Sequence, residues 1–353
     1  MKKAYALGIK STSIGVVVAL YNGEQHIKAA LSSINSQTLL PSEVVVVDDG
    51  SVDRGPEIVE QMISEGLLDS KIFRLLKQQN SGQGNARNAG VAVLSTSHVA
   101  FLDQDDIWGE LHLEQLMFRM QNSPNSNIGW VYSDFSEIDG NSRQIRRDFL
   151  KTSEYSIPAP NIFSLLGQDL MMLPSASLVL KQAFDEVSGF DSQFRGYEDD
   201  DLFVRMFLAG WTFDFEPFSN IFYRIHDLNS SGGTSFLVSR KKFFVKMSNI
   251  FEQETNYREH LVHDYLAPRI VRAYITDGYA STLRRDWLTL KAVESNLKEV
   301  ALNLSPKYRG LANLKLKVII FTFSSRYLSI VATKTWRRFA LLRNSKRSDS
   351  RTI

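Results

Sequence analysis

A short apolar segment runs directly into a cluster of acids at Val99-Ala100-Phe101-Leu102-Asp103-Gln104-Asp105-Asp106-Ile107-Trp108. Four apolar residues suffice for a short buried strand. The three carboxylates that follow repel one another unless a cation or a change in backbone direction relieves them. Mg²⁺ and Mn²⁺ suit such oxygen ligands, because proteins bind them through one or two carboxylates while phosphates and water complete the shell. The stretch therefore predicts either a metal site or a solvated acidic turn before a helix that begins near Trp108.

Two other largely apolar runs also end at polar residues. Ile14–Leu20 is followed by Tyr21, and Glu43–Val47 is followed by Asp48 and Asp49. Runs this continuous are typical of central strands in a parallel sheet that is covered on both faces. Because the ligands of open α/β sheets bind beyond the carboxyl ends of the strands, the three strand ends predict one shared site.

Strands and helical segments alternate over the first two thirds of the chain, and helical patterns dominate afterwards. The pattern predicts an α/β domain at residues 1–235, with a mixed, mainly parallel sheet and helices on both faces, and a mainly helical region at 236–353. The loop at Asn80–Gly90 opens a helix, where it could hold a phosphate or only form a glycine turn. An irregular segment is expected at 145–174.

Four consecutive acids, Glu198 to Asp201, open an apolar helical segment. Acids favour a helix N-terminus, but capping requires only one or two, so the excess suggests a general base. Of the six histidines, His226 follows a strand-like segment, where it could complete a metal site or contact a diphosphate. His260 and His263 are expected to be surface residues.

Composition and charge narrow the class of protein. The 353 residues predict about two domains, and no segment approaches the roughly 18 apolar residues of a membrane span. The absence of cysteine and of a convincing signal peptide leads us to expect a cytoplasmic protein. Residues 313–353 hold ten Lys or Arg against one acid, which leaves 31 basic and 38 acidic residues before them. We expect this tail to lie on an anionic membrane surface, or to pack as a helix with a solvated basic face; no nucleic-acid partner is expected.

Residues 12 to 228 resemble the family 2 glycosyltransferases, whose nucleotide-sugar-binding fold is called GT-A. The resemblance rests on six motifs in the family's order: Val18-Ala19-Leu20-Tyr21-Asn22, Val47-Asp48-Asp49-Gly50-Ser51-Val52-Asp53, Asn80 to Gly90, Asp103-Gln104-Asp105-Asp106, Glu198-Asp199-Asp200-Asp201-Leu202 and Tyr223-Arg224-Ile225-His226. The segment Asp103–Trp108 is similar to that of bacterial cell-surface polysaccharide enzymes, rhamnosyltransferases among them.

The resemblance implies a role for each motif. Tyr21 and Asp49 would contact the nucleotide base, and Asp103 would lie by the ribose. Asp105, with His226, would hold Mn²⁺ or Mg²⁺ against the diphosphate. The residues implied at the donor are Ala19, Tyr21, Asp48, Asp49, Arg87, Asp103 and Gln104.

The general base implied by the resemblance is Asp199. Asp200 departs from the family, whose members often carry an aromatic residue there, and this leaves Glu198 as an alternative base. The implied reaction is an inverting, metal-dependent transfer of a sugar from a UDP- or dTDP-sugar to a glycan or lipid-linked acceptor, at the membrane surface.

Two other functions share parts of this pattern. A nucleotidyltransferase that makes sugar nucleotides would carry a glycine-rich phosphate loop with Arg and Lys after the first strand, where this chain has Tyr21-Asn22-Gly23-Glu24. A non-catalytic sugar-nucleotide-binding module would have no use for the acids at Glu198–Asp201.

Overall fold

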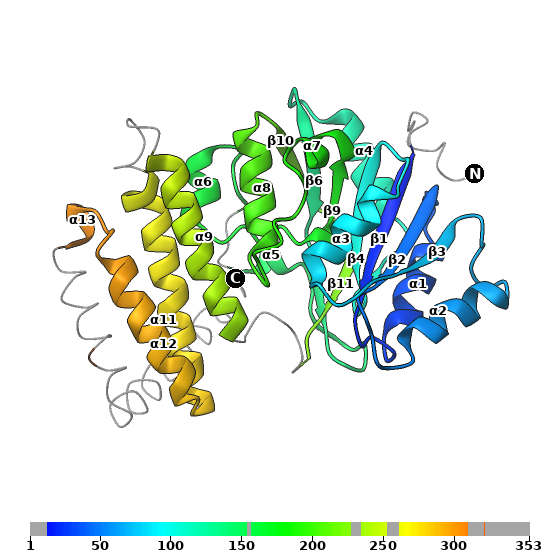
Figure 1. The fold of residues 1–353 in the computed structure, drawn as a ribbon. Coiled ribbons are helices and arrows are strands. Elements are labelled where there is room, and N and C mark those ends of the chain that lie inside the picture. Colours follow the sequence, from blue (N-terminus) through cyan, green and yellow to red (C-terminus); the bar gives the residue numbers. More distant parts are fainter. Residues whose placement is uncertain (1–12, 154–156, 227–233, 253–260, 310–320, 322–353) are drawn as a thin grey trace, which may run out of the picture. The chain divides into compact units, whose positions relative to one another are not determined.

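The computed structural model describes residues 13–153, 157–226, 234–252, 261–309 and 321 (Figure 1). Contacts divide the chain into two compact units, one of residues 1–165 and 169–239, the other of 166–168 and 240–353. Helix α9 (Thr234–Glu252) contains both this boundary and the boundary predicted at residue 235, which remains a prediction.

The first unit is built on a seven-stranded sheet. All neighbouring strands are parallel except β9, which is antiparallel to both of its neighbours. The order is β10 (Thr212–Glu216), β6 (Ile128–Ser133), β9 (Ser177–Leu180), β4 (His98–Asp103), β1 (Ile14–Leu20), β2 (Glu43–Asp48), β3 (Phe73–Lys77). The predicted mixed, mainly parallel sheet is confirmed.

The sheet centre is buried because its strands are apolar on both faces. All seven residues of β1 are buried. Helix α3 (Gln83–Ala92) approaches β1 so closely that a Cβ on Gly90 would collide with Val17. Helices α1 (Ile27–Asn35) and α2 (Gly55–Ser64) contact each other, and they lie side by side near β3 in Figure 1.

A second, four-stranded sheet corrects one expectation. Trp108 does not begin a helix, because β5 (Ile107–Trp108) pairs with β11 (Ile221–Arg224), and the helix α4 starts later, at His112–Asn122. The backbone N–H of Trp108 donates to Ser33 Oγ, which connects this strand to helix α1 (Ile27–Asn35). The remaining strands are β7 (Ser136–Ile138) and β8 (Gln144–Arg146).

The segment from Ile128 to Ile138 does not form one continuous strand. It splits into β6 and β7, which belong to different sheets, because the buried carboxylate of Asp134 accepts the N–H groups of Phe135 and Leu150 and turns the chain. The segment expected to be irregular at 145–174 contains part of β8, two short helices, α5 (Phe149–Thr152) and α6 (Ile162–Gly167), and the start of a 3₁₀ turn at Pro174–Ala176.

The second unit is helical, as expected. Its described elements are the part of α9 from Arg240 to Glu252, a π-helical turn at Leu261–Leu266 and helices α11 (Ala267–Arg284), α12 (Trp287–Ala301) and α13 (Pro306–Arg309). Helix α11 ends where Arg285 adopts a left-handed conformation, and Asp286 then caps α12 by accepting the N–H of Thr289. The tight turn allows α11 and α12 to pack closely on each other.

His263 is half-buried rather than on the surface, because its Nδ1 contacts the carbonyl of Asn303, while His260 lies outside the described residues. The basic tail also lies outside them, apart from the exposed Phe321. Among the helices that are described, none combines the length and apolarity needed to cross a bilayer.

Candidate active site

The three polar strand ends predicted to meet do lie at one sheet edge. In the parallel register, Leu20 of β1 stands opposite Asp48 of β2, and Ala19 stands opposite Asp103 of β4. All three strands point the same way, so the residues that follow them emerge together at the carboxyl edge.

Asp49 uses both carboxylate oxygens to hold the glycine loop before α3. Oδ1 accepts the N–H of Ser81 at 2.8 Å and the Nε2–H of Gln78 at 2.7 Å, while Oδ2 accepts the N–H of Gly82 at 2.8 Å. Gly82 has a φ of 95°, which a residue with a side chain adopts only under strain. Its neighbour Asp48 caps its own turn by accepting the N–H of Ser51.

Gln104 connects the end of β1 to the turn Asp103–Asp106 at the end of β4, called the acidic turn below. Its Oε1 accepts the N–H of Tyr21 at 2.7 Å, and its Nε2 donates to the Tyr21 carbonyl at 3.0 Å. The backbone of Tyr21 is thereby fixed, while its side chain remains 47% exposed and free to meet a ligand.

A buried arginine joins the acidic turn to the acids of helix α8 (Glu198–Leu208). Arg87, in α3, is 3% exposed; it pairs with Asp103, and its Nη1 lies 3.7 Å from Oε1 of Glu198. Burial alone would lower the pKa of Arg87, but these carboxylates outweigh burial and raise it. Arg87 is therefore a fixed cation between two acidic segments that are far apart in sequence.

The four acids that open α8 have different surroundings. Asp201, fully buried, pairs with Arg205 at 2.7 Å, and Glu198 lies near Arg87 and accepts the N–H of Gly196. Asp199 accepts only the N–H of Asp200, and no cation lies within ion-pair distance of it among the described residues. Burial, followed by the negative charges of Asp200 and Glu198, raises the pKa of Asp199 to about 8.

The acidic turn after β4 meets the end of β11. Nε2 of His226 lies 2.8 Å from Oδ2 of Asp105, so the two predicted metal ligands are in contact. Asp106 is buried; its Oδ1 accepts the N–H of Arg224, while its Oδ2 has no hydrogen-bond partner among the residues that the structure describes. Burial and the charges of Asp103 and Asp105 raise the pKa of Asp106 well above its usual value.

The donor set fits a hard divalent cation. Within the described residues, no group of three His, Asp or Glu side chains is placed to hold a metal ion. Mg²⁺ and Mn²⁺ do not require three, since substrate phosphates and water usually complete a site that begins with one or two carboxylates. Asp105 and His226 are the two residues that could begin such a site.

The family model for glycosyl transferase family 2 matches residues 15–188, which include the ends of β1, β2 and β4. The chain therefore contains a glycosyl transferase family 2 domain. An uncharacterized glycosyltransferase of Nostoc sp. is 26% identical to it over 67% of this chain and 73% of the relative. The amylovoran biosynthesis glycosyltransferase AmsB of Erwinia amylovora is 27% identical over 58% of this chain and 67% of the relative.

The fold of the glycosyltransferase has solved counterparts. The structure of S. aureus TarS residues 1–349 in complex with UDP-GlcNAc has a TM-score of 0.61 and 17% sequence identity, over 92% of each chain. At this identity the likeness concerns the fold, and it confirms the predicted GT-A class.

One residue beside the glycosyltransferase site was not predicted. The ring of His26, at the start of α1, stacks on the ring of His226 with centroids 5.9 Å apart and an angle of 26° between the planes. Burial, followed by the charge of Arg224, lowers the pKa of His26. Its place five residues after Tyr21, in the first turn that follows a strand end, is the only indication that the sequence carries.

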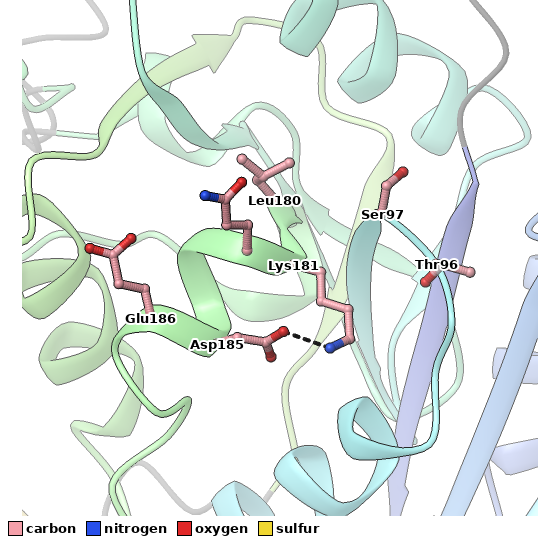
Figure 2. A pocket seen from close by; sticks show the side chains of 7 residues that line it. Thr96, Ser97, Leu180, Lys181, Asp185 and Glu186 are labelled. Atoms are coloured by element: carbon pink, nitrogen blue, oxygen red, sulfur yellow. Dashed lines mark hydrogen bonds and ion pairs between the residues drawn. The ribbon is translucent and has the colours of Figure 1, made fainter.

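A surface pocket of about 720 Å³ lies at the other edge of the same sheet (Figure 2). It is lined by Thr96 and Ser97, just before β4, by Leu180 at the end of β9, and by Lys181, Gln182, Asp185 and Glu186 of α7 (Lys181–Glu186). The most prominent polar contact drawn there is the ion pair of Lys181 with Asp185 at 2.7 Å. None of the predicted site residues lines this pocket, so the carboxyl edge remains the candidate active site.

Proposed function

We propose that the enzyme transfers a sugar from a UDP- or dTDP-sugar to a hydroxyl of a glycan or lipid-linked acceptor in cell-surface polysaccharide synthesis, with inversion at the anomeric carbon. The observation that carries the proposal is Asp199, a carboxylate with a pKa raised to about 8 and no cation partner among the described residues. The names of the relatives support the substrate class, because AmsB is an amylovoran biosynthesis enzyme and TarS has been solved with UDP-GlcNAc.

The donor lies across the carboxyl ends of β1, β2 and β4. The exposed ring of Tyr21 packs against the base, and Asp49 borders the base while it holds the loop at Ser81 and Gly82. Asp103 lies by the ribose, oriented by Arg87 and by the amide of Gln83 at 2.9 Å. Ala19, Asp48 and Gln104 line the same edge.

Transfer is a single displacement. The acceptor oxygen attacks the anomeric carbon, the bond between that carbon and the diphosphate oxygen breaks, and Asp199 takes the proton of the acceptor hydroxyl. A divalent cation held by Asp105 and His226 would neutralise the charge that develops on the diphosphate. Glu198 is the weaker candidate for the base, because it already lies near Arg87 and bonds the N–H of Gly196.

A donor panel tests the proposal. The full-length protein is incubated with UDP- and dTDP-sugars, dTDP-rhamnose among them, with Mn²⁺ or Mg²⁺ and a mixture of lipid-linked and glycan acceptors. We expect free nucleoside diphosphate, no release in the presence of a chelator, and a product of inverted configuration by NMR. Release of pyrophosphate would identify a nucleotidyltransferase, and a product of retained configuration would exclude the single displacement.

A further inference from the structure

His26 lies next to the proposed metal site, although none of the sequence motifs that predict this site contains His26. The ring is half-buried and stacked on His226, and His226 in turn contacts Asp105. Three side chains, from the start of α1, the turn after β4 and the end of β11, thus form one row, in which His26 is the outer member.

The position of His26 is fixed by contacts at the start of α1. Its backbone N–H donates to the carbonyl of Gly23 at 3.1 Å, and the buried Ile27 after it anchors α1 to the core. A Cβ on Gly23 would collide with the side chain of Gln104, the residue that bonds the backbone of Tyr21. The backbone that leads to His26 therefore packs directly against Gln104, the residue before Asp105.

His226 needs such support because regular structure ends before it. Strand β11 stops at Arg224, and the N–H of Ile225 makes the last described backbone bond, to Ile138. The ring of His226 must nevertheless present Nε2 to Asp105. A flat ring stacked at 5.9 Å restricts the rotation of the neighbouring ring.

We propose that His26 is a positioning residue that orients the imidazole of His226 for the divalent cation, an inference that rests on the proposed function. His26 is not a third ligand, since no three such side chains among the described residues are placed to hold a metal. It acts through the face of its ring. Residues that orient metal-ligating histidines through hydrogen bonds typically contribute about 10- to 100-fold to metal affinity, and a stacked ring is expected at the lower end of this range.

Two substitutions distinguish the effect of the ring of His26 from the effect of its nitrogen atoms. His26→Phe keeps a flat ring and removes both nitrogens, whereas His26→Ala removes the ring. The full-length proteins are titrated with Mn²⁺ in the presence of UDP, with free Mn²⁺ followed by electron paramagnetic resonance. Lys28→Ala, an exposed residue of the same helix, is the control.

We expect wild type, His26→Phe and Lys28→Ala to bind Mn²⁺ with the same affinity, and His26→Ala to bind it about tenfold more weakly with an unchanged melting temperature. Equal affinity of His26→Ala and wild type would overturn the inference while leaving the proposed function intact. An equal loss of Mn²⁺ affinity in His26→Phe and His26→Ala would overturn it too, because the effect would then come from a ring nitrogen and not from the stacked ring. If wild type with UDP bound no Mn²⁺, the metal dependence of the proposed function would fail as well.

Discussion

His112 makes the stability of the protein depend on pH in a way that one substitution can remove. The side chain, in α4, is 1% exposed and stacks on Trp108 with ring centroids 4.7 Å apart. Neither ring nitrogen has a hydrogen-bond partner in the described part of the chain. Because burial penalises the charged form, the pKa of His112 falls from 6.5 to about 3.

The sign and size of the effect follow from proton linkage. Below pH 6.5 the unfolded chain takes up a proton at His112 while the folded protein does not, so the free energy of unfolding decreases as the pH falls from 6.5 towards 3. Each pH unit within this window costs about 1.4 kcal/mol. Between pH 7.5 and 5.0, His112 should therefore remove about 2 kcal/mol of stability.

The assay is urea unfolding, followed by tryptophan fluorescence, at pH 7.5 and 5.0. His112→Phe keeps the stack on Trp108 and cannot be protonated, so it should lose about 2 kcal/mol less than wild type between the two pH values. Leu116→Ala, fully buried in the same helix, is the control: it should lower stability by about 2–5 kcal/mol at both pH values without changing the difference between them. The same pH dependence in wild type and His112→Phe would refute the reasoning.

Three further predictions concern activity and the tail. Asp199→Asn should lower kcat by about 10²- to 10⁴-fold with little change in the KM for donor. The kcat of wild type should rise with pH and level off above about 8, because the base acts when it is deprotonated. A larger loss of kcat in Glu198→Gln, at unchanged donor affinity, would instead identify Glu198 as the base. Asp105→Ala should abolish transfer together with Mn²⁺ binding at an unchanged melting temperature, and full wild-type turnover in a chelator would contradict this. Full-length protein should co-sediment with anionic liposomes at low salt, at about 1 kcal/mol for each basic residue near the surface, whereas a chain ending at Leu311 should not; equal partitioning of the two, or binding that is insensitive to salt, would speak against a membrane role.

The sequence is informative where one stretch of chain is sufficient to decide the structure. Ile14–Leu20 and Glu43–Val47 are apolar almost without interruption, and central strands of a covered sheet bury both faces in this way. Parallel strands place their carboxyl ends together, so the order of strands and helices along the chain is enough to bring Tyr21, Asp48 and Asp103 to one edge. The fold class and the place of the site follow from such local patterns.

The sequence is misleading where the partner lies far along the chain. Ile107 and Trp108 resemble the start of a helix, yet they form a strand because Ile221 and Phe222 are available to pair with them. Likewise, nothing near Arg87 in the sequence indicates that its guanidinium will reach Glu198. Pairings over such distances depend on how the elements pack, which hydrophobic periodicity does not encode.

The acids that open α8 illustrate how packing separates residues that the sequence presents as equivalent. Asp201 is compensated by Arg205 on the next turn of its own helix, and Glu198 lies near Arg87, a cation that belongs to α3. With the nearby cations committed to its neighbours, Asp199 experiences burial and the residual negative charge of Asp200 and Glu198, and its pKa rises for that reason. A carboxylate is a stronger base when its own ionisation is made costly. Burial and the two neighbouring charges therefore have a common consequence, which is to make one carboxylate of the cluster able to hold a proton near neutral pH.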